Sequence, residues 1–223
     1  MPVSALRTIL EEMANAASDA QRPAARLLAV SKTQPAGAVA ALAAQGQAAF
    51  GENYVQEAAG KIAELQALGL EWHLIGHLQS NKADQAARLF DWVQTVDRPK
   101  LVPALARHRP DDRPPLNVLI QVNIDDESSK HGCTPTEIPA LAAAIAAQPR
   151  LCLRGLMAIP APFPEAARRQ AAFARMRALY DALAADHPQV DTLSMGMSAD
   201  FAQAIAAGAT LVRVGTALFG ARH

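Results

Sequence analysis

Leu27-Leu28-Ala29-Val30-Ser31-Lys32-Thr33 is the first buried strand that the sequence predicts, and it sets the pattern for the whole chain. A continuous apolar run that ends in a lysine predicts a strand over 27–33, buried on both faces as in a parallel sheet, with Lys32 at its carboxyl end. An ammonium in an apolar surround is costly unless it is paired, or unless the amine loses its proton and becomes a nucleophile toward a carbonyl. The alternative is that Lys32 lies just outside the strand and extends into water.

The pattern of a short apolar strand followed by a helix recurs along the rest of the chain. An amphipathic helix comes first, with apolar side chains at helical spacing: Leu6, Ile9, Leu10 and Met13. Strands are predicted over 27–33, 48–53, 72–76, 92–97, 117–123, 152–159, 192–197 and 211–216. Helices are predicted between them over 36–45, 54–68, 81–90, 99–107, 136–147, 165–185 and 199–207, several of them bounded by proline or glycine.

Eight strands alternating with helices match a closed (β/α)8 barrel, the TIM barrel, and a length of 223 residues suits that fold. An open doubly wound sheet is the structural alternative. It usually has fewer strands and, when it binds nucleotides, a GxGxxG turn after the first strand, which this sequence lacks. No linker divides the sequence, so we expect one domain over 1–223, with the opening helix as an addition to the barrel.

Composition excludes several classes of function. The formal net charge is zero, with 21 basic and 21 acidic residues, and the basic residues are not clustered, so no nucleic-acid partner is expected. The two cysteines, Cys133 and Cys152, form no CxxC pair, which argues against a disulfide framework or structural zinc and fits a reducing cytosol. The sequence offers neither a signal peptide nor an apolar run that could span a bilayer. We therefore expect a soluble cytoplasmic protein without a membrane partner.

Chemistry in such a barrel takes place at the ring of strand carboxyl ends, and phosphate often binds after strands seven and eight. The residues predicted at this ring are Lys32, Asn53, His77, Asn123, Met157, Ser194, Gly196, Ser198, Arg213, Gly215 and Thr216. Those after the last two strands predict an anion site, because Ser198 can cap a helix while Gly196, Gly215 and Thr216 offer close backbone approach and a hydroxyl. Ordinary capping and tight turns are the alternative.

Arg213 alternates in phase with Gly215, so its side chain is expected to point into the barrel mouth. There a phosphate or a ring nitrogen could partner it, and a buried ion pair with Glu52 is the alternative. A lysine that attacks carbonyls, a phosphate site and an inward cation together favour an aldehyde that carries a phosphate. Pyridoxal phosphate fits this description, with Lys32 as the imine.

Seven blocks in one order cover nearly the whole chain: 29–33, 50–57, 72–82, 129–132, 155–157, 194–198 and 213–216. With these blocks the sequence resembles the family of pyridoxal phosphate homeostasis proteins, which have the barrel fold of the alanine racemase N-terminal domain. The resemblance implies that Lys32 carries the cofactor as a Schiff base and that Arg213 faces the pyridine nitrogen. It also implies that Ser198, Gly215 and Thr216 hold the phosphate. We assign Asn53 and Ser194 to the same cofactor site.

The expected role is to bind and hand over the cofactor, without catalytic residues. An arginine is too basic to give the pyridine nitrogen its proton, so the ring would be a weaker electron sink than one paired with an aspartate. The racemases that the barrel resembles add a second domain with a tyrosine acid/base, whereas nothing follows His223 here and the only tyrosines are Tyr54 and Tyr180. We expect a monomeric carrier or regulator, with pyridoxal-phosphate-dependent apoenzymes as recipients.

Two other functions stay open at this point. One is an amino-acid racemase or decarboxylase that a partner completes, and the other is a sugar-phosphate aldolase that uses a lysine imine.

Five polar residues have weaker predictions. Lys82 and Lys130 could form a landing patch for phosphate during transfer, although solvated surface lysine is the alternative. His73 and His77 stand four residues apart, but on a strand and its turn and without an evident third ligand, so no metal site is expected. Cys133 is expected to be a bystander, because only His131 is near enough in sequence to lower its pKa.

Overall fold

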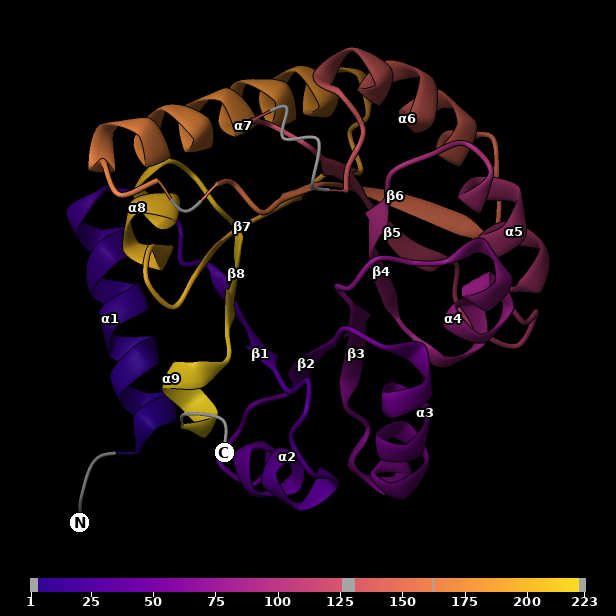
Figure 1. The fold of residues 1–223 in the computed structure, drawn as a ribbon, viewed down its shortest axis with the longest axis horizontal. Coiled ribbons are helices and arrows are strands. Elements are labelled where there is room, and N and C mark those ends of the chain that lie inside the picture. The colour runs from indigo at the N-terminus through magenta and orange to yellow at the C-terminus, as the bar shows by residue number, and fades with distance from the viewer. Residues whose placement is uncertain (1–3, 126–130, 162, 221–223) are drawn as a thin grey trace.

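Eight parallel strands close into a barrel, each strand pairing with the next in sequence and the last pairing with the first (Figure 1). The computed structural model describes residues 4–125, 131–161 and 163–220. Its strands are β1 (Arg26–Val30), β2 (Ala49–Glu52), β3 (Glu71–Leu74), β4 (Trp92–Val96), β5 (Leu116–Val122), β6 (Leu151–Ala158), β7 (Thr192–Met197) and β8 (Leu211–Val214). The predicted (β/α)8 barrel is therefore confirmed.

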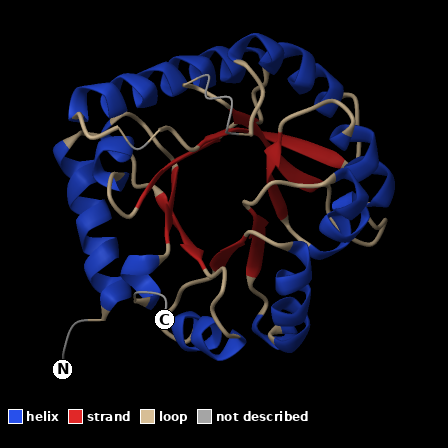
Figure 2. Cartoon of the chain, viewed as in Figure 1, coloured by secondary structure: helices blue, strands red, loops and turns tan. Residues whose placement is uncertain are grey.

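Helices surround the barrel on its outer side (Figure 2). The α-helices are α1 (Ala5–Asp19), α2 (Ala36–Ala43), α3 (Val55–Glu64), α4 (Ala83–Leu89), α5 (Leu101–His108), α6 (Ile138–Ala146), α7 (Ala166–Asp186), α8 (Phe201–Ala206) and α9 (Thr216–Phe219). The described residues also include three single turns of 3-10 helix: η1 (Gln66–Leu68), η2 (Ser80–Lys82) and η3 (Pro135–Glu137). In the described part of the chain, no helix has both the length and the apolar character needed to cross a bilayer.

The extra N-terminal helix α1 begins at the N-cap Ser4, whose hydroxyl accepts a hydrogen bond from the backbone of Arg7. It packs against α8 and α9 with its apolar side, as its periodicity predicted. Leu10 departs from that prediction, because its side chain is 45% exposed and does not join the core.

Most predicted strands extend too far toward their carboxyl ends. β1 stops at Val30 instead of Thr33, and β8 stops at Val214 instead of Thr216. The polar residues that follow turn away from the sheet instead, as Thr33 shows with a φ of 65°, which no strand residue adopts. These departures create the loops at the barrel mouth. The short helix α9, which the sequence analysis did not predict, begins directly after β8.

The main apolar core lies between the barrel and its surrounding helices. The barrel interior holds two small apolar groups, one of Leu28, Ala49 and Leu211 and one of Trp92, Leu119 and Met157. Buried polar side chains, among them Gln94, Ser194 and Arg213, lie between these groups and the mouth. An interior that is packed in this way supports a site only at its mouth.

Candidate functional site

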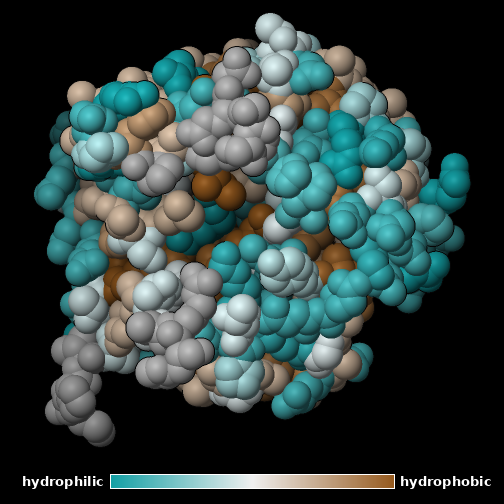
Figure 3. Space-filling model, in the orientation of Figure 1, coloured by the Kyte–Doolittle hydropathy of each residue, from teal (hydrophilic) through white to brown (hydrophobic). Residues whose placement is uncertain are grey.

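A hollow of about 800 Å³, counted out to its open mouth, lies at the carboxyl ends of β7, β8, β1 and β2. Figure 3 shows this face of the molecule, on which hydrophilic and hydrophobic side chains meet around a central depression. Six of the seven residues assigned to the cofactor site line the hollow: Lys32, Asn53, Ser198, Arg213, Gly215 and Thr216. The seventh, Ser194, does not.

Lys32 lies two residues beyond β1, so it is outside the strand but half-buried in the wall of the hollow. Its Nζ forms no hydrogen bond or ion pair with any residue that the structure describes. The amine is thus available to a ligand, and it neither extends freely into water nor pairs with a carboxylate.

Lys61, a buried lysine on α3, forms the hydrogen bonds beneath the loop that carries Lys32. Lys61 Nζ donates three hydrogen bonds of 2.7 Å, to the carbonyl of Ser31, to Oε1 of Glu52 and to Oε1 of Glu57. The Glu52 side chain is fully buried on β2, and its Oε1 also accepts from the hydroxyl of Ser31 at 2.6 Å. Burial raises the pKa of Glu52, while the hydrogen bonds from Lys61 and Ser31 act against that rise.

The two peptide groups that flank Lys32 are both attached to this network. On one side the carbonyl of Ser31 accepts from Lys61, and on the other the N–H of Thr33 donates to Oε1 of Glu57 at 2.5 Å. The backbone that carries the amine is therefore fixed from below by a buried ion-pair group, which orients Lys32 without touching its side chain.

Arg213 lies on β8 with only 4% of its surface exposed, and its guanidinium faces the base of the hollow. Nη1 donates to the hydroxyl of Ser194 at 2.6 Å, and Nη2 donates to the carbonyl of Ala158 at 2.8 Å. Burial lowers its pKa to about 10, with the charge of Asp200 opposing, so the guanidinium remains protonated at neutral pH. No carboxylate of the described residues pairs with it, and the ion pair with Glu52 considered from sequence is wrong, because Glu52 pairs with Lys61.

Ser194 begins a chain of hydrogen bonds that crosses the barrel interior below Arg213. Its hydroxyl donates to Oε1 of Gln94 at 2.7 Å, and Nε2 of Gln94 donates to Nδ1 of His73 at 2.9 Å. His73 is then left with its proton on Nε2, which donates to Glu71 at 2.8 Å. Every donor in the chain points the same way, from Arg213 toward Glu71. Ser194 holds Arg213 in position through this hydrogen bond, and it does not itself line the hollow.

The last two groups of this chain, His73 and Glu71, have pKa values that are both lowered, for different reasons. Burial lowers the pKa of His73, so its ring is neutral at neutral pH. Burial alone would raise the pKa of Glu71, but the hydrogen bond from His73 and the ion pair with Arg26 outweigh it and lower that pKa to about 2.

Unpaired backbone donors gather between the ends of β7 and β8. Among the described residues, no acceptor receives a hydrogen bond from the backbone N–H groups of Ser198, Gly215 and Thr216. A side chain at position 215 would bring its Cβ to 3.2 Å from the carbonyl oxygen of Val30, which is closer than most side chains tolerate. Glycine therefore allows the backbone to lie this close to β1 beside the hollow, which all three residues line.

Two details of the predicted anion site are wrong. The N-cap of α8 is Asp200 and not Ser198, which lies in the turn before it. Gly196 has a φ of 90° and lies against α8, where a Cβ would collide with Ala204, so it serves helix packing and not the hollow. The register of β7 against β8 shifts between Ser194 and Met197, so the end of β7 is irregular at these positions.

The sequence analysis missed the apolar wall of the hollow, formed by Val30, Ile75, Ile159 and Met197. Each ends or directly follows a strand of the structure, but in the sequence apolar residues at these positions look like ordinary core. Met197 is 40% exposed and Ile159 is 37% exposed, which leaves the mouth open to solvent. Gln34 and Gly220 complete the lining.

The remaining predicted residues lie elsewhere. His73 is inside the barrel and His77 is at its rim, so the two do not share a site. Lys82 is half-buried and lines a separate hollow beside Asn53, while Lys130 lies outside the described residues. Burial raises the pKa of the Cys133 thiol to about 12, which agrees with its predicted role as a bystander.

The charge of the hollow indicates its ligand. Of the described side chains that line it, two are basic, Lys32 and Arg213, and none is acidic. With free backbone N–H groups at one end and an unpaired amine at the other, the lining suits a ligand that has an anionic group and a carbonyl. An aromatic aldehyde phosphate fits this set, and the apolar side chains match its ring.

Known proteins give the same indication. The family model described as "Alanine racemase, N-terminal domain" matches residues 4–223. A protein of Escherichia coli K12 named "Pyridoxal phosphate homeostasis protein" is 55% identical over 199 residues, 88% of this chain and 85% of that protein. One of Pseudomonas aeruginosa with the same name is 53% identical over 226 residues, 97% of each chain.

Solved structures agree with these sequence matches. PipY of Synechococcus elongatus, solved without pyridoxal phosphate (PLP), is 41% identical and superposes with a TM-score of 0.84 over 95% of this chain and 100% of its own. Its structure with PLP bound gives 40% identity and a TM-score of 0.79, with the same coverage of both chains.

Proposed function

This chain belongs to the alanine racemase N-terminal domain family and, within it, to the pyridoxal phosphate homeostasis proteins, and on that premise we propose that it holds pyridoxal phosphate on Lys32 as a carrier without robust catalysis. One observation carries the proposal. Among the described residues, the hollow at the barrel mouth is lined by two basic side chains and by no acidic one, and its lysine has no hydrogen-bond or ion-pair partner.

Each part of the lining has a role in this proposal. The amine of Lys32 takes the aldehyde, while Ser198, Gly215 and Thr216 hold the phosphate with hydroxyl and backbone N–H donors. Arg213 donates to the pyridine nitrogen, and Asn53 lies at the edge of the same hollow. Ser194 does not touch the ligand in this proposal, and it acts by holding Arg213 in position through a hydrogen bond.

Two features support holding the cofactor over turning over a substrate. Bound pyridoxal phosphate supplies an electron-withdrawing ring, and an arginine whose pKa is about 10 keeps its own proton and does not strengthen that ring. Neither tyrosine lines the hollow, since Tyr180 is buried on the outer helix α7 and Tyr54 is exposed before α3. The described lining therefore offers no tyrosine to move a proton on the far side of a substrate.

We further propose that the barrel is a single domain, that it acts as a monomer in the cytoplasm, and that apoenzymes receive the cofactor from it. Both Cys133 and Cys152 are free thiols, which suits a reducing compartment. The exposed Met197 at the mouth leaves a path for release.

Borohydride trapping tests the assignment of Lys32. Purified protein is incubated with pyridoxal phosphate, its visible spectrum is recorded, and the reduced protein is mapped by peptide mass. We expect a yellow protein with the pyridoxyl group on Lys32, and loss of both signals in Lys32→Ala but not in the surface control Lys100→Ala. A colourless protein, as a sugar-phosphate aldolase would give, or modification at another lysine would refute the proposal.

Turnover assays test the carrier role separately. The loaded protein is incubated with amino acids, and racemisation and decarboxylation are followed, while a parallel sample is mixed with a pyridoxal-phosphate-dependent apoenzyme. We expect activation of the apoenzyme and no robust amino-acid turnover. Rapid turnover that depends on Lys32 would favour the racemase or decarboxylase alternative instead.

A further inference from the structure

Three neighbouring strands bring two histidines and an aspartate together at the barrel rim. His77 follows β3, Asp97 follows β4 directly, and His131 lies in the connection after β5. None of the three lines the hollow that holds Lys32. The sequence analysis considered His77 only with His73, a residue that lies inside the barrel, and so missed this group.

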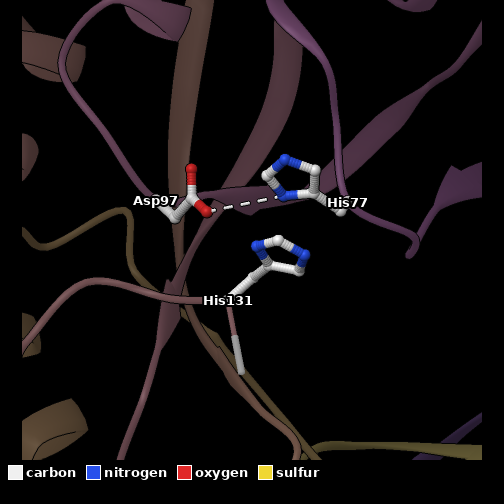
Figure 4. A group of neighbouring side chains, drawn as sticks. All are labelled: His77, Asp97 and His131. Carbon is white, nitrogen blue, oxygen red and sulfur yellow. Dashed lines mark ion pairs between the residues drawn. The ribbon is translucent and has the colours of Figure 1, made fainter. Parts of the chain in front are cut away.

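The three side chains present their ligand atoms to one another (Figure 4). One ligand atom from each lies within 4.8 Å of the other two, and Nδ1 of His77 is 3.7 Å from Oδ2 of Asp97. The imidazole rings are stacked, with centroids 3.6 Å apart and planes at 16°. In Figure 4 each ring has one nitrogen on the side of the Asp97 carboxylate.

The carboxylate is oriented by its neighbour in sequence. Arg98 donates from Nη1 to Oδ1 of Asp97 at 2.5 Å and from Nη2 to the carbonyl of Leu78 at 2.7 Å. Oδ1 is thereby held away from the histidines, and Oδ2 remains toward them. A ligand carboxylate that accepts an outer hydrogen bond is the usual arrangement around protein-bound metal ions.

We propose that His77, Asp97 and His131 bind one divalent transition-metal ion of the zinc class. Two imidazoles and one carboxylate suit Zn²⁺ and Co²⁺, whereas Mg²⁺ and Ca²⁺ prefer oxygen ligands alone. Zinc–ligand lengths of about 2.0–2.2 Å place tetrahedral ligand atoms roughly 3.3 Å apart. The present separations need only a small closure, which the exposed side chains of His77 and His131 can make by rotation.

Such an ion would connect the loops after β3, β4 and β5, opposite the loops of β7, β8 and β1 that surround the cofactor hollow. The three ligands leave a coordination position for water, which is the ligand count of an open zinc site.

Metal titration of the untagged, full-length chain tests the proposal. Protein freed of metal by chelation is titrated with Zn²⁺ by calorimetry and with Co²⁺ by visible absorption, both before and after loading with pyridoxal phosphate. We expect one equivalent per chain in the micromolar range and tetrahedral Co²⁺ bands. Binding should weaken at least tenfold in His131→Asn and in Asp97→Asn, which keep shape and near-surface position.

His187→Asn is the matched control, because His187 ends the outer helix α7 and lies outside the group. Circular dichroism establishes that each variant is folded, so that loss of binding is not loss of structure. The proposal is overturned by the absence of micromolar binding, by affinity that the His131 and Asp97 variants leave unchanged, or by a sulfur-to-cobalt band that disappears in Cys133→Ser.

Discussion

The hydroxyl of Ser194 accepts a hydrogen bond from Arg213 at 2.6 Å and donates one at 2.7 Å to Gln94, 100 residues away in sequence. Ser194→Ala would remove one buried hydrogen-bond partner from Arg213 and one from Gln94, which costs roughly 1–3 kcal/mol of stability. Because the guanidinium then keeps only its bond to the carbonyl of Ala158, we also expect weaker pyridoxal phosphate binding and a shifted absorption maximum. Denaturant unfolding and cofactor titration measure the two effects.

Thr95→Ala separates these effects, because Thr95 is an equally buried hydroxyl that donates only to the carbonyl of Gly76. It should lose similar stability and keep the spectrum of the parent. If both variants change the spectrum alike, Ser194 is merely structural.

The ion pair beneath the Lys32 loop predicts a second result. Lys61→Met leaves the fully buried Glu52 without its cation, and breaking a buried pair in this way costs about 3–5 kcal/mol. The double variant Glu52→Gln with Lys61→Met removes both charges and should recover most of that loss in stability. Unfolding free energies of the two single variants and the double variant give the coupling directly.

Trapping of the cofactor at Lys32 should not recover in the double variant, because the carbonyl of Ser31 still lacks its donor. Leu65→Ala, at the end of the same helix, serves as a destabilised control that keeps the network. Equal trapping in the double variant and the parent would show that the network does not position the lysine.

Two glycines predict opposite results for the same change. Gly215→Ala brings a Cβ to 3.2 Å from the Val30 carbonyl, so we expect a loop displaced by a few tenths of an ångström, little loss of stability, and reduced cofactor affinity. Gly196→Ala forces a methyl group into Ala204 at a φ of 90° and should destabilise the fold by about 2 kcal/mol or more. Thermal unfolding and cofactor titration distinguish them; unchanged affinity in Gly215→Ala would contradict the phosphate assignment.

The fold was predictable because it follows from local patterns. Each strand is a short apolar run, and proline or glycine marks the bounds of several helices. Eight repeats of this pattern were enough to predict a closed barrel. The residues around the hollow were mostly predictable for a related reason, since a barrel places its site at the strand ends. Lys32 and Arg213 line one hollow although 180 positions separate them in the sequence.

What sequence could not give depends on side-chain partners and on irregular backbone. Ser194 follows the inward alternation of β7 correctly, but only the structure shows that Arg213 lies above it and closes it off from the hollow. Glu52 was considered as a partner of Arg213 because no pattern indicates which of two cations a buried carboxylate meets. The group of His77, Asp97 and His131 was missed because its members belong to three separate loops.

The far end of the interior chain predicts how stability depends on pH. The pKa of Glu71 is about 2 in the folded protein, below its usual value of 4.5, because the hydrogen bond from His73 and the ion pair with Arg26 outweigh the effect of burial. A carboxyl group with a lowered pKa stabilises the fold fully above its unfolded pKa, and this contribution disappears as the pH falls from about 4.5 toward 2.

Urea midpoints at a series of pH values from 6 down to about 3 should therefore fall more steeply in the parent than in Glu71→Gln, which has no carboxyl group to protonate at this position. The two curves should differ most at the upper end of the range, where the parent has its full ionic contribution, and converge as the pH decreases. Parallel curves would mean that Glu71 titrates alike in the folded and unfolded chain, and the hydrogen-bond chain from Arg213 would then lack its anionic end.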